Sequence, residues 1–227
     1  MRRALVLLAL LMCIVQAWGA GLQDLTNRDA VSGLKDALSQ GAAAAIGKLG
    51  VENGFLGNDK VRIPLPPPIK RIESGARLLG LQSQIDELET SMNHAAEQAV
   101  PQAKPLFVRA IKNMSVQDAK GILTGGDTAA TEYFRKSTSD QLAQRFKPIV
   151  TQVTRKIGLT EKYDQLAERG AQLGLIDAKQ AKIEDYVTQK ALDGLFLMLA
   201  EEEKNIRKDP AAAATGIARK VFQLLQQ

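Results

Sequence analysis

The stretch IEDYVTQKALDGLFLMLAEEEKNIR, residues 183–207, decides the fold class of this chain. Its apolar residues recur every three or four positions, as at Ile183 and Val187, which is the spacing of an amphipathic helix and not of a strand. The run GLFLML in its second half is apolar on every side. We therefore expect a helix that passes through the middle of the protein, with Leu195 and Leu199 buried.

The three glutamates that follow this run should turn the helix toward solvent. Consecutive helical residues point about 100 degrees apart, so Glu201, Glu202 and Glu203 cannot share one pocket as paired catalytic carboxylates or calcium ligands. We expect all three on a solvated face, with Glu203 and Arg207 spaced for an ion pair one helical turn apart.

Helical spacing continues through most of the remaining chain, from Ile85 to Ala99 and again from Leu142 to Ile157. Ser115 with Asp118 has the pattern of a capping box at a helix start. Prolines 101 and 105 predict either two helices or one kinked helix between residues 84 and 113. Helix ends are indicated by Gly125-Gly126 and by Gly158. The sequence therefore predicts an all-α protein, a single-domain multi-helix bundle.

The exception to helical spacing is a short extended, proline-rich segment at about residues 50–68. Val61, Ile63 and Leu65 alternate with Arg62 and Pro64 as in a strand, but the prolines confine such a strand to an edge or to polyproline II geometry. The segment could be a proline-rich ligand for another protein, or a strap that lies over the bundle. We favour the strap, with Ile63 and Leu65 buried beneath it, and a small hairpin before it is possible in principle.

Residues 1–20 have the composition of a secretory signal peptide that is removed from the mature protein. Arg2 and Arg3 precede an apolar run of residues 4–15, which is too short to span a membrane. A lipidated Cys13 would need a small residue before it, and Met12 is not small. We therefore expect a mature domain of residues 21–227 that is periplasmic or secreted, with no membrane span.

The composition excludes several classes of protein. Cys13 is the one cysteine of the 227 residues, so a mature chain without it can form no disulfide. Loss of Arg2 and Arg3 would lower the formal net charge from +5 to about +3. Because this charge is weak and only 4% of the residues are aromatic, we expect no nucleic-acid partner.

No stretch of the sequence carries a recognisable catalytic, metal or cofactor motif. His94 is the one histidine, and it falls toward the polar side of its predicted helix, so we expect a surface residue. The loop Thr124-Gly125-Gly126-Asp127-Thr128 lacks the Gly-Lys-Ser/Thr ending of a phosphate-binding loop. We therefore expect no cofactor and no metal, and we favour a protein without catalysis.

Several strings taken together resemble one family across nearly the whole mature chain. They are Gly33-Leu34-Lys35 with Ala37-Leu38, Asn53-Gly54-Phe55-Leu56, Val61-Arg62-Ile63-Pro64-Leu65-Pro66, Met92-Asn93 with Ala95-Ala96-Glu97, Asp127 to Phe134, Phe146-Lys147-Pro148-Ile149-Val150 and Tyr186 to Pro210. In these strings the chain is similar to the bacterial family catalogued as domain of unknown function 4197. The resemblance implies an exported, predominantly helical protein without an established activity.

Five polar residues embedded in the matched strings are the candidate binding site: Asn93, Glu97, Asp127, Thr131 and Tyr133. Helix caps and interhelical hydrogen bonds would require the same residue types, and we favour this scaffold role. In particular, Asp127 follows two glycines, so its carboxylate should accept from the free amides of the helix that begins there.

The function expected from these observations is a non-catalytic binding or interaction module of the bacterial envelope. Its partner is left open by the sequence, between an envelope protein and an apolar ligand. A second possibility is a carrier of lipid or another apolar ligand, because an aliphatic core poor in aromatics could open between the helices. A third is a hydrolase that assembles its site from scattered carboxylates.

Overall fold

The computed structural model describes residues 27–78, 80–156, 158, 161, 163–165, 168, 172 and 182–209. The predicted signal peptide, residues 1–20, lies outside these residues. Within them the secondary structure is helical and contains no strand, which confirms the all-α prediction. The elements are α1 (Asn27–Leu49), α2 (Pro67–Leu78), α3 (Gln82–Ala99), the 3-10 turn η1 (Val100–Ala103), α4 (Lys104–Asn113), α5 (Val116–Thr124), α6 (Ala129–Lys156) and α8 (Ile183–Lys208).

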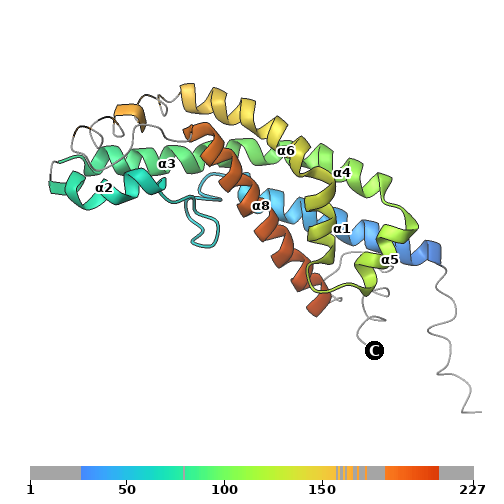
Figure 1. Cartoon of the computed structure of the whole chain (residues 1–227). Helices are drawn as coiled ribbons and strands as arrows, with labels where there is room; N and C mark the ends of the chain where they lie inside the picture. Colours follow the sequence, from blue (N-terminus) through green and yellow to red (C-terminus); the bar gives the residue numbers. More distant parts are fainter. Residues whose placement is uncertain are drawn as a thin grey trace, which may run out of the picture.

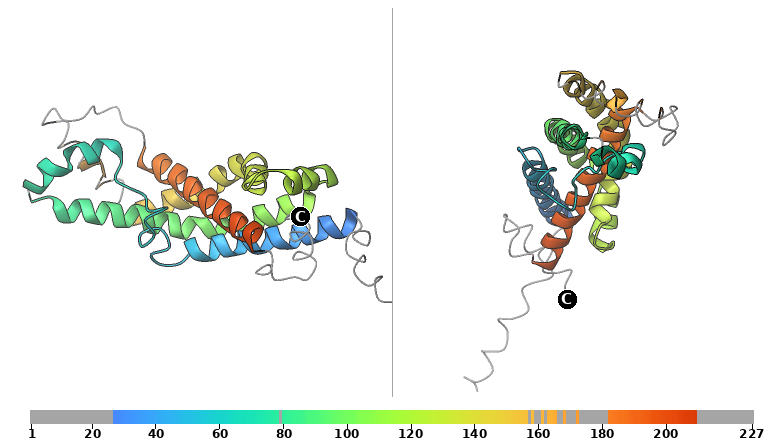
Figure 2. Two further views of the ribbon diagram at one scale, coloured as in Figure 1. Left: turned by 90° about the horizontal axis from the view of Figure 1, so that it is seen from below. Right: turned by 90° about the vertical axis from the view of Figure 1, so that its left-hand side faces the viewer.

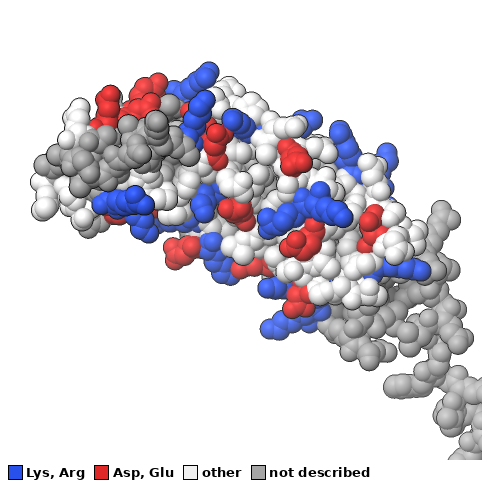
Figure 3. Space-filling view, viewed as in Figure 1, with Lys and Arg blue, Asp and Glu red and all other residues white. Residues whose placement is uncertain are grey.

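The helices form an elongated bundle, with α2 at one end and the start of α1 together with α5 at the other (Figures 1 and 2). Helix α8 runs diagonally across the middle and packs on α6, α1 and α3. Both signs of charge are interspersed over the face seen in Figure 3. Among the described residues, no helix is long and apolar enough to cross a membrane.

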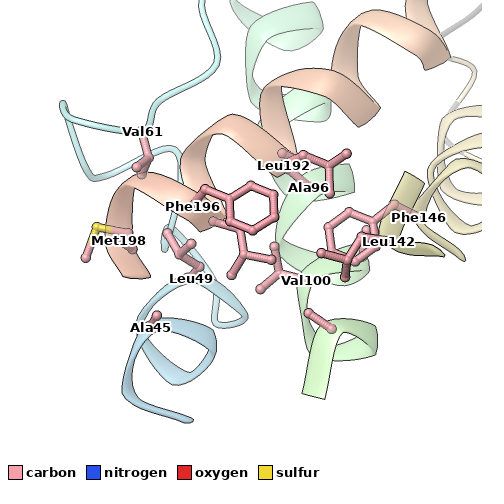
Figure 4. Close-up of a cluster of buried hydrophobic side chains, with 14 of the residues drawn as sticks. Ala45, Leu49, Val61, Ala96, Val100, Leu142, Phe146, Leu192, Phe196 and Met198 are labelled. Carbon is pink, nitrogen blue, oxygen red and sulfur yellow. The ribbon is translucent and has the colours of Figure 1, made fainter. Parts of the chain in front are cut away.

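The centre of α8 is buried as predicted. Leu195 and Leu199 lie in the core, but Leu197 between them is 42% exposed, so the expectation of an apolar run buried on every side is wrong. A helix that packs on three neighbours still leaves one stripe toward solvent. Figure 4 shows side chains of α8 meeting those of α1, α3, η1 and α6, with the labelled members Ala45, Leu49, Val61, Ala96, Val100, Leu142, Phe146, Leu192, Phe196 and Met198.

The predicted helix boundaries agree with local hydrogen bonding. The Asp118 amide donates to Ser115 Oγ at 3.1 Å, and the Ser115 amide donates to the Asp118 carboxylate at 3.0 Å, which completes the capping box of α5. Helix α5 ends before Gly125, and Gly158 follows α6 with a φ of 64°. The prolines after α3 produce two helices joined by the turn η1, the first of the two alternatives.

Residues 50–66, which we call the strap, link α1 to α2 across the bundle. Ile63 and Leu65 are 1% and 7% exposed, which confirms that the segment covers the core and buries them. The strap forms successive tight turns before it extends, with Asn53 at a φ of 61°, so the hairpin that was possible in principle does not form. An extended segment without a neighbouring strand must find other partners for its backbone amides and carbonyls.

Candidate functional site

Asn93 of α3 supplies the backbone partners that a neighbouring strand would otherwise provide to the strap. Its Oδ1 accepts from the Ile63 amide at 2.8 Å, and its Nδ2 donates to the Ile63 carbonyl at 3.0 Å and to the Glu89 carbonyl at 2.8 Å. Asn93 is fully buried. Because this side chain pairs both backbone groups of Ile63, it fixes the register of the strap on α3.

Glu97, one turn further along α3, holds the first part of the strap. One oxygen of its carboxylate, Oε1, accepts from the amides of Phe55 and Leu56 at 3.0 and 3.2 Å. The side chain is only 6% exposed. Hydrogen bonds to a carboxylate are stronger than those between neutral groups, which strengthens the contact of Glu97 with the strap. Two predicted site residues, Asn93 and Glu97, are therefore anchors of the strap.

Helix α8 fixes the other side of the strap. A Cβ at Gly194 would lie 2.7 Å from Phe55 Cε1, so only glycine lets the buried phenylalanine ring lie against this helix. The Tyr186 hydroxyl donates to the Pro64 carbonyl at 3.0 Å, and burial raises the pKa of this phenol. Ion pairs of Lys60 with α8 and of Arg62 with α3 add surface links at 2.7 and 2.8 Å.

Thr131 belongs to a second polar cluster, at the start of α6. Its amide and hydroxyl donate to Glu203 Oε2 at 2.8 and 2.9 Å, and the Ala130 amide donates to Glu203 Oε1 at 2.9 Å. Arg207 donates to the same Oε1 at 2.9 Å and to the Ile122 carbonyl at 2.8 Å. The predicted pair of Glu203 with Arg207 is confirmed, but Glu203 is buried and not on a solvated face. It acts as a helix cap supplied from a distant part of the chain.

Asp127 does not have the capping role that we expected. The amides of Ala130 and Thr131 in the first turn of α6 already donate to Glu203, and Asp127 is exposed. Glu203 reaches these amides from α8 with both of its carboxylate oxygens, so the amides are not available to Asp127. Tyr133, the remaining predicted residue, donates its hydroxyl to the Ala110 carbonyl at 2.9 Å, and burial raises its pKa. The five predicted residues thus form separate clusters and not one site.

A groove opens where the strap meets α2 and α8. It has a volume of about 500 Å³ and is lined by Pro64, Leu65, Pro67, Lys70, Arg71, Tyr186 and Lys190. Lys70 and Arg71 are exposed on α2 and form no ion pair with a described residue. On α8, the Lys190 ammonium lies 5.9 Å from the centre of the Tyr186 ring and 3.9 Å from Asp193. The groove combines three cations with flat apolar surfaces.

A smaller hollow of about 280 Å³ lies at the end of α3, against the turn after α1. Glu52, His94 and Glu97 line it together with Val51, Gln98 and Pro101. The expectation of an ordinary surface histidine is only partly right, because the His94 side chain is 36% exposed while its Nε2 is buried without a hydrogen-bond partner. That nitrogen lies 3.9 Å from Glu97 Oε2, too far for a hydrogen bond.

A match to a known protein family covers all of these features. Residues 24–223 match a family described as protein of unknown function (DUF4197). The chain belongs to this family. No curated protein matches it, and no solved structure does. The matched residues include the strap, the groove and the hollow, so all three are parts of the DUF4197 region of the chain.

The sequence does not single out Glu203 and Gly194, two residues on which the packing of this DUF4197 structure depends. Three consecutive glutamates are typical of an exposed face, and Gly194 stands within an apolar run. Nor does the sequence single out Lys70, Arg71 and Lys190 of the groove or Glu52 of the hollow. The available signal for Gly194 was a glycine in the interior of a long helix, which usually marks a close approach by another segment. Within the described ranges no group of three His, Cys, Asp or Glu side chains could hold a metal ion.

Proposed function

We propose that this protein is a non-catalytic binding module and that it binds an acidic, extended segment of a partner protein in the groove between the strap, α2 and α8. The observation that carries the proposal is the charge of the groove. Lys70, Arg71 and Lys190 surround it, and among its described lining residues there is no carboxylate. A cationic groove attracts acidic partners and repels basic ones.

The apolar walls of the groove favour a protein segment over a small anion. Pro64, Pro67 and the Tyr186 ring offer flat surfaces to the side chains that alternate with acidic residues in an extended peptide. A lone phosphate or sulfate would use the cations alone and leave these surfaces uncovered.

One wall of the groove is held in a single position before any partner binds. Pro64 and Leu65 belong to the strap, whose register is fixed by Asn93 and whose carbonyl at Pro64 is held by Tyr186. A wall ordered in advance lowers the entropy lost on binding. The buried polar residues of the strap thus support the proposed function without touching the partner.

The alternative functions have less structural support. An apolar pocket between α1, α6 and α8 has a volume of about 20 Å³, enough for one water molecule and not for an acyl chain. Glu52 and Glu97 line the same hollow and so supply the two carboxylates that a hydrolase would need. The His94 Nε2, however, is buried, so it is not placed to exchange a proton with a substrate in the hollow.

Fluorescence anisotropy with labelled peptides tests the proposal. A peptide of alternating glutamate and leucine should bind, while matched peptides with glutamine or lysine in place of glutamate should not. Binding should weaken as salt is added, because exposed charges are screened. The double variant Lys70→Glu with Arg71→Glu should lose the binding, whereas Lys104→Glu with Arg109→Glu on exposed positions of α4 should retain it. Equal binding by both double variants would overturn the proposal.

The place of action is the second part of the proposal. We propose that residues 1–20 are removed on export and that the protein acts in the periplasm or outside the cell. Mass analysis of the protein purified from its native host should give a first residue between Trp18 and Leu22, without a lipid on Cys13. A chain that retains residues 1–20, or an acylated cysteine, would contradict this part.

A further inference from the structure

The hollow at the end of α3 contains a carboxylate oxygen that the fold does not use. Both strap amides, from Phe55 and Leu56, donate to one oxygen of Glu97, while Oε2 makes no hydrogen bond with any described residue. A neutral glutamine could accept the same two amides. Anchoring the strap therefore accounts for Oε1 but leaves Oε2 without a role in the fold.

The surroundings of Glu97 do not neutralise this charge. The nearest nitrogen of a titratable side chain is His94 Nε2, at 3.9 Å from Oε2, and it too lacks a hydrogen-bond partner. The hollow has a second carboxylate, Glu52, and its described lining includes no lysine or arginine. The Glu97 side chain is 6% exposed and its Oε2 keeps contact with solvent, so a donor that enters the hollow can reach this oxygen.

We propose that this hollow binds the cationic head of an organic ligand, an ammonium or a guanidinium group, with Glu97 Oε2 as its main acceptor. Such a group donates charge-assisted hydrogen bonds to a carboxylate, and Glu52 adds a second negative charge at the rim. Val51, which is 54% exposed, and Pro101 offer apolar surface for the methylene groups that carry the charged head.

The geometry favours an organic cation over a metal ion. Only His94 and Glu97 approach each other here, and in the described part of the chain no third His, Cys, Asp or Glu completes a metal-binding group. A volume of about 280 Å³ is close to the lower end of the range for small-molecule sites. This site is separate from the cationic groove and does not depend on the function proposed for it.

The site is tested by titrating the mature protein with small probes while the amide NMR signals of Phe55 and Leu56 are recorded. These amides donate to Glu97 and so report on its carboxylate. Saturable shifts are expected with n-butylamine and n-butylguanidine, at a dissociation constant of about 1 mM, as for one charge-assisted contact by a small ligand. The neutral control n-butanol should give no saturable shift.

Variants separate the site from the scaffold. Glu97→Gln keeps an acceptor for the strap amides but removes the charge, so affinity should fall at least about tenfold. Glu132→Gln, on an exposed position of α6, should leave affinity unchanged. If Glu97→Gln does not fold, Glu52→Gln serves instead, with an expected loss of about threefold for an exposed charge. Unchanged affinity in these variants, or saturable shifts with n-butanol, would overturn the proposal.

A peptide probe distinguishes a cation carried by a partner protein from a small cationic metabolite. A capped pentapeptide with one central arginine among alanines should bind more tightly than n-butylguanidine if the natural ligand is a side chain of a partner protein. Tighter binding by the free amines indicates a small metabolite. Either result supports a cation site, while absence of saturable shifts with every cationic probe refutes it.

Discussion

Replacement of Asn93 by alanine removes the side chain that pairs the strap with α3. The change leaves the Ile63 amide and carbonyl without the partners that lie at 2.8 and 3.0 Å, and Ile63 is too buried for water to replace them. Each buried polar group left without a partner costs about 1–3 kcal/mol. We therefore expect Asn93→Ala to lower the free energy of unfolding by about 3 kcal/mol or more.

Urea unfolding followed by circular dichroism measures this loss, and thermal melting gives an independent estimate. For a chain of this size, 3 kcal/mol corresponds to a decrease in Tm of about 6–12 °C. Asn205→Ala is the matched control, because Asn205 is exposed on α8 and the substitution brings the same gain in helix propensity. The control should change stability by less than about 0.5 kcal/mol.

A second substitution tests the direction of the hydrogen bonds. Asn93→Asp keeps an acceptor for the Ile63 amide but turns an oxygen toward the carbonyls of Ile63 and Glu89. Near neutral pH it should be at least as destabilising as the alanine variant, since a buried charge then faces two acceptors. If Asn93→Ala costs no more than Asn205→Ala, the strap is held by its apolar contacts and our account of Asn93 is refuted.

Three further predictions concern the core and the helix caps. Leu195→Ala should cost about 2–5 kcal/mol in a denaturant titration by loss of buried surface and formation of a cavity, whereas the half-exposed Leu197→Ala should cost less than about 1 kcal/mol. Glu203→Ala should lower the free energy of unfolding by about 2–4 kcal/mol, because three buried donors at the start of α6 lose their acceptor. Glu202→Ala is the control. It removes only the ion pair with the half-exposed Lys48 and should cost less than about 1 kcal/mol. The hydrogen bonds from Ser115 lower the pKa of the Asp118 carboxyl below its ordinary 3.8. The stability that this cap contributes should therefore be complete above pH 3.8 and be lost as the pH falls through the lowered pKa. An NMR titration of the Asp118 carboxyl that finds a raised pKa would contradict this prediction.

Stability and peptide binding should respond differently to substitutions in the anchors of the strap and in the groove. The anchors Asn93 and Glu97 act on the strap, so Asn93→Ala should weaken peptide binding in the groove as well as stability. Lys70→Glu, by contrast, should change peptide binding and leave stability unchanged, since Lys70 is exposed and forms no ion pair with a described residue. A measurement of both quantities on each variant keeps the effects on the fold apart from those on binding.

The sequence alone determined the features that depend on neighbours within one or two helical turns. The spacing of Leu195 and Leu199 predicted their burial, the Ser115 pattern predicted a capping box, and the alternation around Ile63 predicted a strap that buries its apolar side chains. In each case the interacting groups are close along the chain, or the apolar residues need only some covering partner and not a particular one.

Only the tertiary structure decided which distant groups meet. Glu203, more than 70 positions along the chain, caps α6 in place of the adjacent Asp127, and Asn93 pairs with a strap residue 30 positions earlier. Gly194 is required because Phe55 packs against α8 at that point. These partners are fixed by the angle and offset at which whole helices pack. That arrangement depends on the fit of many side chains at once, so no local pattern around Glu203 or Asn93 encodes it. The glycine at position 194 indicates a close approach but not which segment makes it.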